Sequence, residues 1–159
     1  MKMRSVDDIL QSILGSRVVV IGDIMLDEYL HGSVTRINPE GPAPLISVEY
    51  LDYRVGGAAN TAANIVSLRG ICSLMGTIGN DTDASTLRQK IIGAGIDSVL
   101  ITLQKTTTKK TRIIVGNQQM LRYDQEEKSS ISAEDEVFIE SVLNQTHADV
   151  IILVSDYAK

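Results

Sequence analysis

The sequence contains no tryptophan, one phenylalanine and one cysteine among 159 residues. With Cys72 alone, no internal disulfide and no cysteine-based zinc cluster can form. Cys72 lies in the apolar run 71–75, so we expect an inert core residue. Aromatic residues make up only 4% of the chain against 43% hydrophobic residues. The core must therefore be built from aliphatic side chains, which suits a parallel sheet covered by helices.

The chain also lacks an excess of positive charge, since its formal net charge is −5. Binding a nucleic acid requires a basic face, so we expect no such partner. The one basic group comprises Lys105, Lys109, Lys110 and Arg112. Its ordinary interpretation is a solvated loop, but we favour a site for one small anion.

Long hydrophobic runs are absent as well. The longest near the N-terminus, residues 18–21, is far too short to span a membrane. The N-terminus also has no secretory signal pattern. We therefore expect no membrane association and a cytoplasmic location.

The hydrophobic periodicity predicts strands that alternate with helices. Helices are expected over 6–14, 58–68 (ended by Gly70), 81–92 and 134–143 (capped by Ser132). Buried strands are expected over 17–21, 71–78 and 150–154, and a further strand over 99–103. A protruding edge strand is expected within the proline-containing stretch 34–55, and a hairpin of 111–115 and 119–123 around Gly116 and Asn117.

This alternation predicts an α/β fold with a parallel sheet, on one domain of 159 residues. Ligands bind such sheets beyond the carboxyl ends of the strands. Asp23, Asp27, Asp81 and Asp156 each follow a predicted strand, so we expect them at one edge.

Asp23 and Asp27 suit a polyol ligand, because carboxylates make strong, directional hydrogen bonds with hydroxyl groups. The ordinary alternative is a turn or a helix cap. Gly56 and Gly57 leave room for close approach of a ligand, and Asn60 follows in the first turn of the predicted helix. A tight Gly-Gly turn with close helix packing is the alternative. The spacing fits neither a dinucleotide fingerprint nor a P-loop.

These motifs, in this order, resemble the ribokinase-like (PfkB) carbohydrate kinases. The similar segments are Gly22-Asp23-x-x-x-Asp27, the proline-rich stretch 38–44 and Gly56-Gly57-Ala58-Ala59-Asn60. Segments 110–112, 117–124 and 155–159 bring the chain closer to the heptose 7-phosphate kinases of lipopolysaccharide-core synthesis within this family. The resemblance covers about 17–159. It implies the N-terminal half of a ribokinase-like fold, with a small β lid formed by strands within about 34–55 and 111–123.

The resemblance also implies a substrate site. Asp27 would bind sugar hydroxyls with Asp23 nearby, and the sugar-side wall would be formed by Gly56, Gly57 and Asn60. The residues on or near the lid would be Lys110, Arg112, Asn117 and Arg122. Asp156 and Lys159 would face the cleft. A substrate that already bears a phosphate needs cations, which gives the basic group a role. The lid would also form a homodimer interface.

In sequences of this family, the catalytic motifs come after the position that corresponds to Lys159. They are an Asn/Glu motif associated with magnesium, a Gly-Ala-Gly-Asp-type motif with the anion hole and catalytic Asp, and the adenine pocket. We therefore expect ATP and Mg²⁺ to serve the complete enzyme, none to be bound by this chain, and no turnover by this chain alone. Three alternatives stay open: a fructokinase- or nucleoside-kinase-like specificity, a non-catalytic sugar-binding or dimerisation module, and an α/β domain with neither role.

Overall fold

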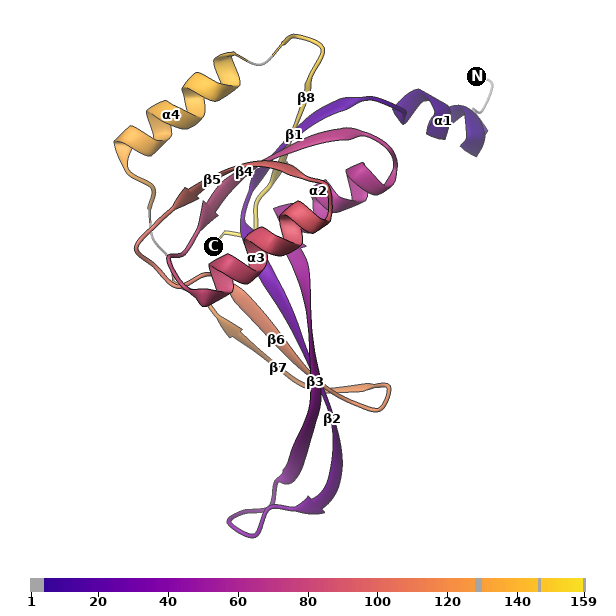
Figure 1. The fold of residues 1–159 in the computed structure, drawn as a ribbon, viewed down its shortest axis with the longest axis vertical. Helices are drawn as coiled ribbons and strands as arrows, with labels where there is room; N and C mark the ends of the chain where they lie inside the picture. Colours follow the sequence, from indigo (N-terminus) through magenta and orange to yellow (C-terminus); the bar gives the residue numbers. More distant parts are fainter. Residues whose placement is uncertain (1–4, 128–129, 146, 159) are drawn as a thin grey trace.

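The computed structural model describes residues 5–127, 130–145 and 147–158, which form two four-stranded sheets and four helices (Figure 1). The elements, in chain order, are α1 (Val6–Ile13), β1 (Arg17–Gly22), β2 (Ile24–Ile37), β3 (Pro44–Gly57), α2 (Ala58–Ser67), β4 (Ile71–Ile78), α3 (Thr82–Gly93), β5 (Asp97–Thr102), β6 (Lys109–Val115), β7 (Gln118–Gln125), α4 (Ala133–Asn144) and β8 (Ile151–Ser155).

The first sheet is parallel throughout and has the strand order β5-β4-β1-β8. Helices α2 and α3 lie on one side of it (Figure 1). Between them and the sheet, the core joins strand residues such as Val20 and Leu74 to helix residues such as Ala62, Leu87 and Ile91. This confirms the predicted α/β class with a parallel sheet flanked by helices. We call this layered part the body.

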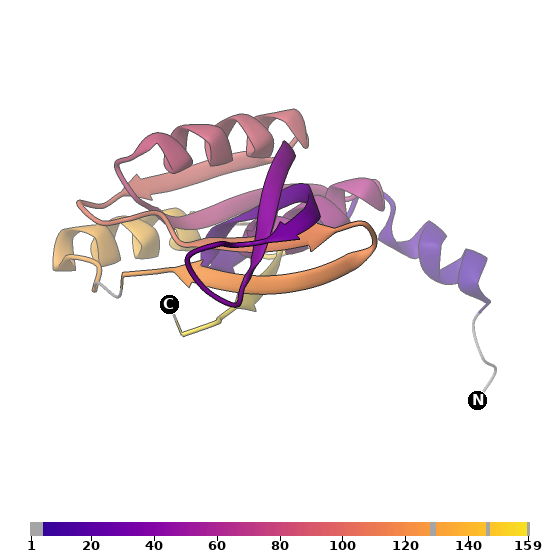
Figure 2. The ribbon, with the colours of Figure 1, turned by 90° about the horizontal axis from the view of Figure 1, so that it is seen from below.

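The second sheet has the order β3-β2-β6-β7 and is of mixed direction, with β2 and β6 parallel and the outer pairs antiparallel. Strands β2 and β3 are each 14 residues long, and their hairpin extends away from the body. Figure 2, seen from below, shows this hairpin nearly end-on with β6 and β7 beside it.

Most of the predicted elements are present. The strand predicted over 71–78 matches β4, and both predicted helix caps are formed, by Asp81 on α3 and by Ser132 on α4. The hairpin turn at Gly116 and Asn117 is also present, with Gly116 at a φ of 58°. Helix α2 departs in one detail, because its left-handed residue is Arg69, and Gly70 follows it.

Three predictions about strands are wrong. Residues 24–33 form most of β2, so Asp27 lies within a strand rather than after one. Strand β8 is at an edge of the sheet formed by the described residues, and Ile151 and Val154 are exposed, because no described element covers them. Strand β1 buries Val18 and Val20 toward the helices, but its alternate residues are only half-buried.

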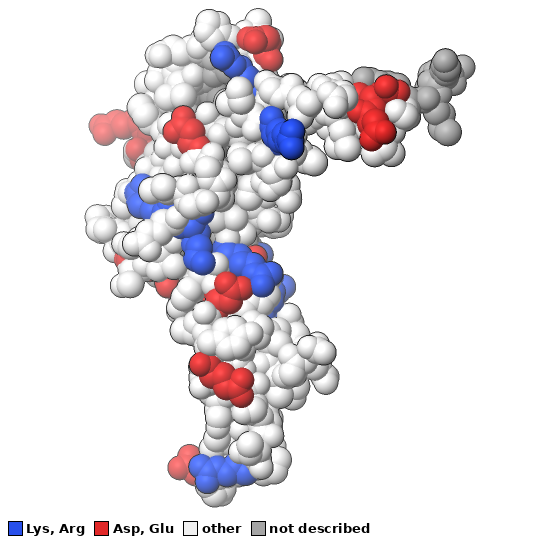
Figure 3. Space-filling view, turned by 45° about the vertical axis from the view of Figure 1, so that its right-hand side comes forward, with Lys and Arg blue, Asp and Glu red and all other residues white. Residues whose placement is uncertain are grey.

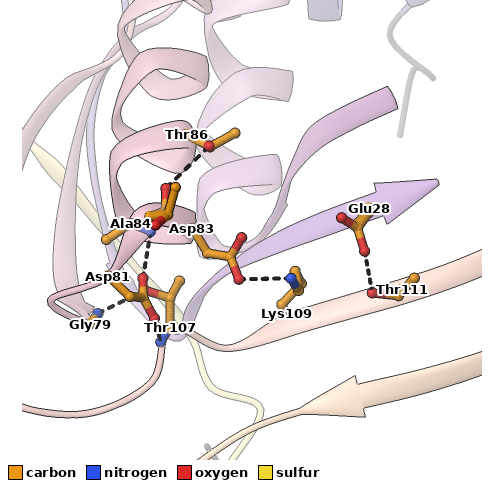
Figure 4. Close-up of polar contacts among 10 residues, drawn as sticks. Glu28, Gly79, Asp81, Asp83, Ala84, Thr86, Thr107, Lys109 and Thr111 are labelled. Carbon is orange, nitrogen blue, oxygen red and sulfur yellow. Dashed lines mark hydrogen bonds and ion pairs between the residues drawn. The ribbon is translucent and has the colours of Figure 1, made fainter. Parts of the chain in front are cut away.

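A polar cluster ties the second sheet to helix α3 (Figure 4). Asp81 caps α3 by accepting from the Ala84 amide at 2.8 Å, and it also accepts from the Thr107 amide at 2.8 Å and the Thr107 hydroxyl at 2.6 Å. The Thr107 hydroxyl, which is fully buried, in turn accepts from the Gly79 amide at 3.1 Å. The end of β4, the start of α3 and the loop before β6 therefore meet at one carboxylate.

Two further contacts continue this cluster into the second sheet (Figure 4). Lys109 on β6 forms an ion pair of 2.8 Å with Asp83 on α3. Beside it, the buried Glu28 on β2 accepts from the Thr111 hydroxyl on β6 at 2.7 Å. Because half-buried charges are strongly disfavoured without partners, the Lys109–Asp83 pair holds the base of the second sheet to α3. The Glu28–Thr111 contact joins β2 to β6 within that sheet.

We predict that Thr107→Val destabilises the chain by about 1–3 kcal/mol at pH 7, because the buried Gly79 amide and the half-buried Asp81 carboxylate each lose a hydrogen bond. Burial acts to raise the pKa of Asp81, but hydrogen bonds from Thr107 and Ala84 outweigh it and hold the pKa below the ordinary value. A depressed pKa stabilises the folded state above the unfolded value, and this contribution is lost as the pH falls. The difference between wild type and variant should therefore shrink toward acid pH.

Urea unfolding at several pH values and constant ionic strength measures this difference. The control is Thr106→Val, since the Thr106 hydroxyl makes only an exposed contact with Glu127. A Thr107→Val effect that grows as the pH is lowered would contradict the assignment.

Candidate functional site

One face of the second sheet carries charged side chains from all four strands. The strand register places Arg54, Asp27, Lys110 and Asp124 in one cross-strand row, and Asp52, Tyr29, Arg112 and Arg122 in the next. Residues paired across a sheet point to the same side, so these eight side chains share one face, which we call the polar face. Figure 3 shows basic side chains crossing the middle of the molecule, with acidic ones among them.

Asp27 lies at the centre of the polar face and is largely shielded from solvent. Its Oδ1 atom pairs with Nη1 of Arg112 at 2.8 Å, and the two side chains are 18% and 20% exposed. Burial acts to lower the pKa of Arg112, but the Asp27 carboxylate outweighs it and raises this pKa above its ordinary value. The Arg112 guanidinium therefore stays charged and holds the Asp27 carboxylate in place.

The two glycines of the second motif are required by contacts within the chain. Gly56 pairs with Met25 across β2 and β3, and a Cβ at Gly56 would lie 3.0 Å from Oδ2 of Asp27. Gly57 has a φ of 56°, and a Cβ there would collide with the carbonyl oxygen of Asp23. Gly56 therefore lets the Asp27 carboxylate rest against bare backbone, and Gly57 lets the chain pass close to the Asp23 carbonyl oxygen.

Asp23 has a different position from Asp27. Its Oδ2 atom accepts from the Tyr157 amide at 2.6 Å, and its carbonyl oxygen accepts from the Ala58 amide at 2.9 Å, at the start of α2. Asp23 thus joins the ends of β1 and β8 to helix α2. The structure places it at this joint and not on the polar face.

Four further residues were predicted to belong to the site: Asn60, Lys110, Asp156 and Lys159. Asn60 is exposed in the first turn of α2, and Lys110 lies 5.4 Å from the ring centroid of Tyr157, which follows β8. Asp156 is exposed and accepts from the Ala158 amide at 2.7 Å. Lys159 lies outside the described residues.

The two predicted residues on or beyond β7 differ as well. Arg122 lies opposite Arg112 on the polar face and pairs with Asp124 at 2.9 Å. Asn117 occupies the turn at the far end of the β6–β7 hairpin. At ~3.3 Å per residue it is roughly 20 Å beyond Lys110 along the sheet. The structure does not bring Asn117 to Asp27.

The predicted anion site of four basic residues does not form as one cluster. Alternation along β6 puts Lys109 on the face opposite Lys110 and Arg112, where it pairs with Asp83. Conversely, sequence reasoning missed Tyr29 and Arg54 on the polar face. Recognition of β2 as a strand would have found them, because alternation from Asp27 then places Tyr29 on the same side.

Two surface hollows lie away from the polar face. One hollow lies between α1 and α2 beside Leu14 and Leu68, and another lies near Val19 and Val150. Neither includes a residue of the polar face. Among residues 5–127, 130–145 and 147–158, no three His, Cys, Asp or Glu side chains converge as metal ligands, and no helix is both long and apolar enough to cross a membrane.

Solved structures of carbohydrate kinases share this fold. Phosphofructokinase-2 from Escherichia coli, in complex with fructose-6-phosphate, matches with a TM-score of 0.69 at 16% identity, over 88% of this chain and 45% of that chain. A putative ribokinase from Agrobacterium tumefaciens matches with a TM-score of 0.55 at 20% identity, over 77% of this chain and 42% of that one. The fold is therefore that of the ribokinase-like kinases. A model of the pfkB family of carbohydrate kinases matches residues 16–156, and the chain belongs to this family, as the motifs predicted.

Curated relatives show higher identity. The bifunctional protein HldE of Methylobacillus flagellatus is 41% identical over 146 residues, which cover 89% of this chain and 30% of that protein. HldE of Citrifermentans bemidjiense is 39% identical over 162 residues, covering 100% of this chain and 33% of that protein. The chain thus spans about a third of the length of these relatives.

We predict that Gly56→Ala destabilises the chain by about 1–3 kcal/mol, because the new methyl group must displace either the Asp27 carboxylate or Met25. Thermal and urea unfolding measure the effect. Gly41→Ala is the matched control, since nothing lies within 4 Å of its Cβ position. Equal stability of the two variants would mean that the Asp27 carboxylate does not rest on Gly56.

Proposed function

We propose that this chain is the sugar-binding part of an ATP-dependent carbohydrate kinase whose acceptor is heptose 7-phosphate. The observation that carries the proposal is the Asp27 carboxylate, held by Arg112 and seated against Gly56 at the centre of the polar face. Membership in the pfkB family supports the reaction class. The similarity to HldE proteins and the heptose kinase-like motifs support the acceptor.

The polar face offers separate chemistry for hydroxyls and for phosphate. Arg112 occupies Oδ1 of Asp27, which leaves Oδ2 to accept from a sugar hydroxyl. Lys110, Arg112 and Arg122 supply positive charge on the β6–β7 side of this carboxylate. Guanidinium groups bind phosphate oxygens in a bidentate manner, so a phosphorylated sugar suits this face better than a neutral one.

In this proposal the chain binds and orients the acceptor. Among the described residues no three His, Cys, Asp or Glu side chains converge as metal ligands, and by the resemblance the family's magnesium and catalytic motifs come after the position of Lys159. We therefore assign the nucleotide, its metal and the catalytic base to residues outside this chain. Phosphoryl transfer depends almost wholly on such positioning and electrostatics, so this chain alone should not turn over. The proposed location is the cytoplasm, where ATP is available.

The alternatives differ in what the polar face should prefer. A fructokinase- or nucleoside-kinase-like acceptor lacks a phosphate, and it would leave Arg122 and Lys110 without a ligand. A non-catalytic module would bind the same sugar with no kinase activity in any longer form of the protein. Comparing the affinities for phosphorylated and unphosphorylated sugars distinguishes the first alternative from the proposed function. A kinase assay of the longer gene product distinguishes the second.

The opposite face of the second sheet supports a homodimer as a further part of the proposal. Its register aligns Leu51, Leu30, Ile113 and Leu121 in one apolar row across all four strands. Leu51 and Leu121 are 47% and 55% exposed. An exposed apolar row on a sheet marks a surface for association, and a second copy of the same lid-like sheet would cover it.

We predict that Asp27→Asn weakens heptose 7-phosphate binding by about 1.5–3 kcal/mol, or roughly 10- to 150-fold, because a charged acceptor is lost. Isothermal titration calorimetry measures the affinity. Asp97→Asn is the control, since Asp97 is exposed at the start of β5, outside the second sheet. Unchanged affinity in Asp27→Asn would refute the assignment of Asp27.

We predict that Leu121→Glu converts the chain from dimer to monomer, because a charge within an apolar row that a partner buries is strongly unfavourable. Light scattering coupled to size-exclusion chromatography measures the mass. Val137→Glu on α4 is a control, since Val137 is exposed at 65% and lies outside the second sheet. A wild type that is monomeric at all concentrations would rule out this interface.

A further inference from the structure

A stacked arrangement on the polar face has no role in the function proposed so far. The guanidinium carbon of Arg54, on β3, lies 4.7 Å from the ring centroid of Tyr29. The guanidinium carbon of Arg112, on β6, lies 5.1 Å from the same centroid. Strand β2 runs between β3 and β6, so one aromatic ring receives cations from both neighbouring strands.

The Tyr29 ring belongs to a short aromatic row along the hairpin. His31 stacks on Tyr29 with a centroid distance of 6.5 Å, and Tyr50 stacks on His31 at 4.4 Å with an interplanar angle of 9°. Such a row restricts the Tyr29 ring. Cation–π contact then orients both guanidinium planes before any ligand arrives.

Both guanidinium groups keep donors for a further partner. Arg54 uses Nε on Asp52 at 2.8 Å, and Arg112 uses Nη1 on Asp27 at 2.8 Å. The Arg54 side chain is 62% exposed, so its Nη groups are accessible to a ligand. Because an exposed ion pair contributes little to stability, the Arg54–Asp52 contact by itself does not explain this arrangement.

We propose that Arg54, oriented by Tyr29, is a specificity residue that recognises the phosphate of the acceptor together with Arg112. This inference rests on the proposed function. Arg112 contacts Asp27 on one side and the Tyr29 ring on the other, so it links the hydroxyl-binding carboxylate to the phosphate-binding pair. The separation of the two subsites would then fix which end of the sugar carries the phosphate.

The test compares heptose 7-phosphate with the unphosphorylated heptose by calorimetry on the 159-residue chain. Arg54→Gln should weaken heptose 7-phosphate binding about tenfold or more, since a charge-assisted contact is lost, and should leave heptose binding unchanged. The matched control is Arg36→Gln, an exposed arginine on β2 near the hairpin tip. It should alter neither affinity.

Two further variants separate charge from orientation. Arg54→Lys keeps the charge without the planar group, and Tyr29→Leu removes the ring but leaves Arg54. Both should lose most of the preference for the phosphorylated sugar. Titration with inorganic phosphate alone measures binding to the same subsite without the sugar. Arg54→Gln should lower the affinity for inorganic phosphate.

The outcomes distinguish this inference from the proposed function. If wild type binds heptose 7-phosphate and Arg54→Gln binds it equally well, the specificity role is wrong and the proposed function stands. Equal weakening of both sugars by Arg54→Gln would also overturn the specificity role. If wild type binds neither sugar nor phosphate, the proposed function itself fails, and this inference with it.

Discussion

The register between β2 and β3 is the constraint on which the candidate site depends. It places Gly56 opposite Met25, so that the carboxylate of Asp27 rests on bare backbone, and it places Gly57 where only a glycine avoids the carbonyl oxygen of Asp23. A slip of one residue would move Asp27 to the face that packs against α3. The two glycines therefore fit this register, and the register determines on which face Asp27 lies.

Strand β2 connects this register to the rest of the molecule, because it belongs both to the core of the body and to the second sheet. Ile24 and Leu26 lie in the core of the body, whereas Asp27 and Tyr29 lie on the polar face. The Lys109–Asp83 ion pair holds β6 to α3 on the other side of the same sheet, and the buried Glu28–Thr111 contact joins β2 to β6 there. The polar face is thus presented by a sheet whose base is rigidly attached.

The faces of the second sheet have opposite chemistry, and this division supports two distinct uses. Alternating charges around Asp27 suit a hydroxylated, phosphorylated ligand, while the apolar row through Leu30 and Ile113 suits a second copy of the sheet. Charges on one face would be costly to bury in a protein interface, and the apolar row could not bind a sugar phosphate. Ligand binding and self-association therefore need not compete.

The sequence by itself determined the α/β class, the family and most helix and strand positions, and it grouped Asp27 with Gly56, which the structure brings together. These features depend on local periodicity, caps and motif order. The sequence did not reveal β2, since Glu28 is a charge on the buried face and breaks the expected alternation. Only the tertiary structure separated Lys109 from Lys110 and Arg112, moved Asn117 away from Asp27 and joined Arg54 to Tyr29. Such relations depend on strand pairing between residues far apart in the chain, which no local pattern encodes.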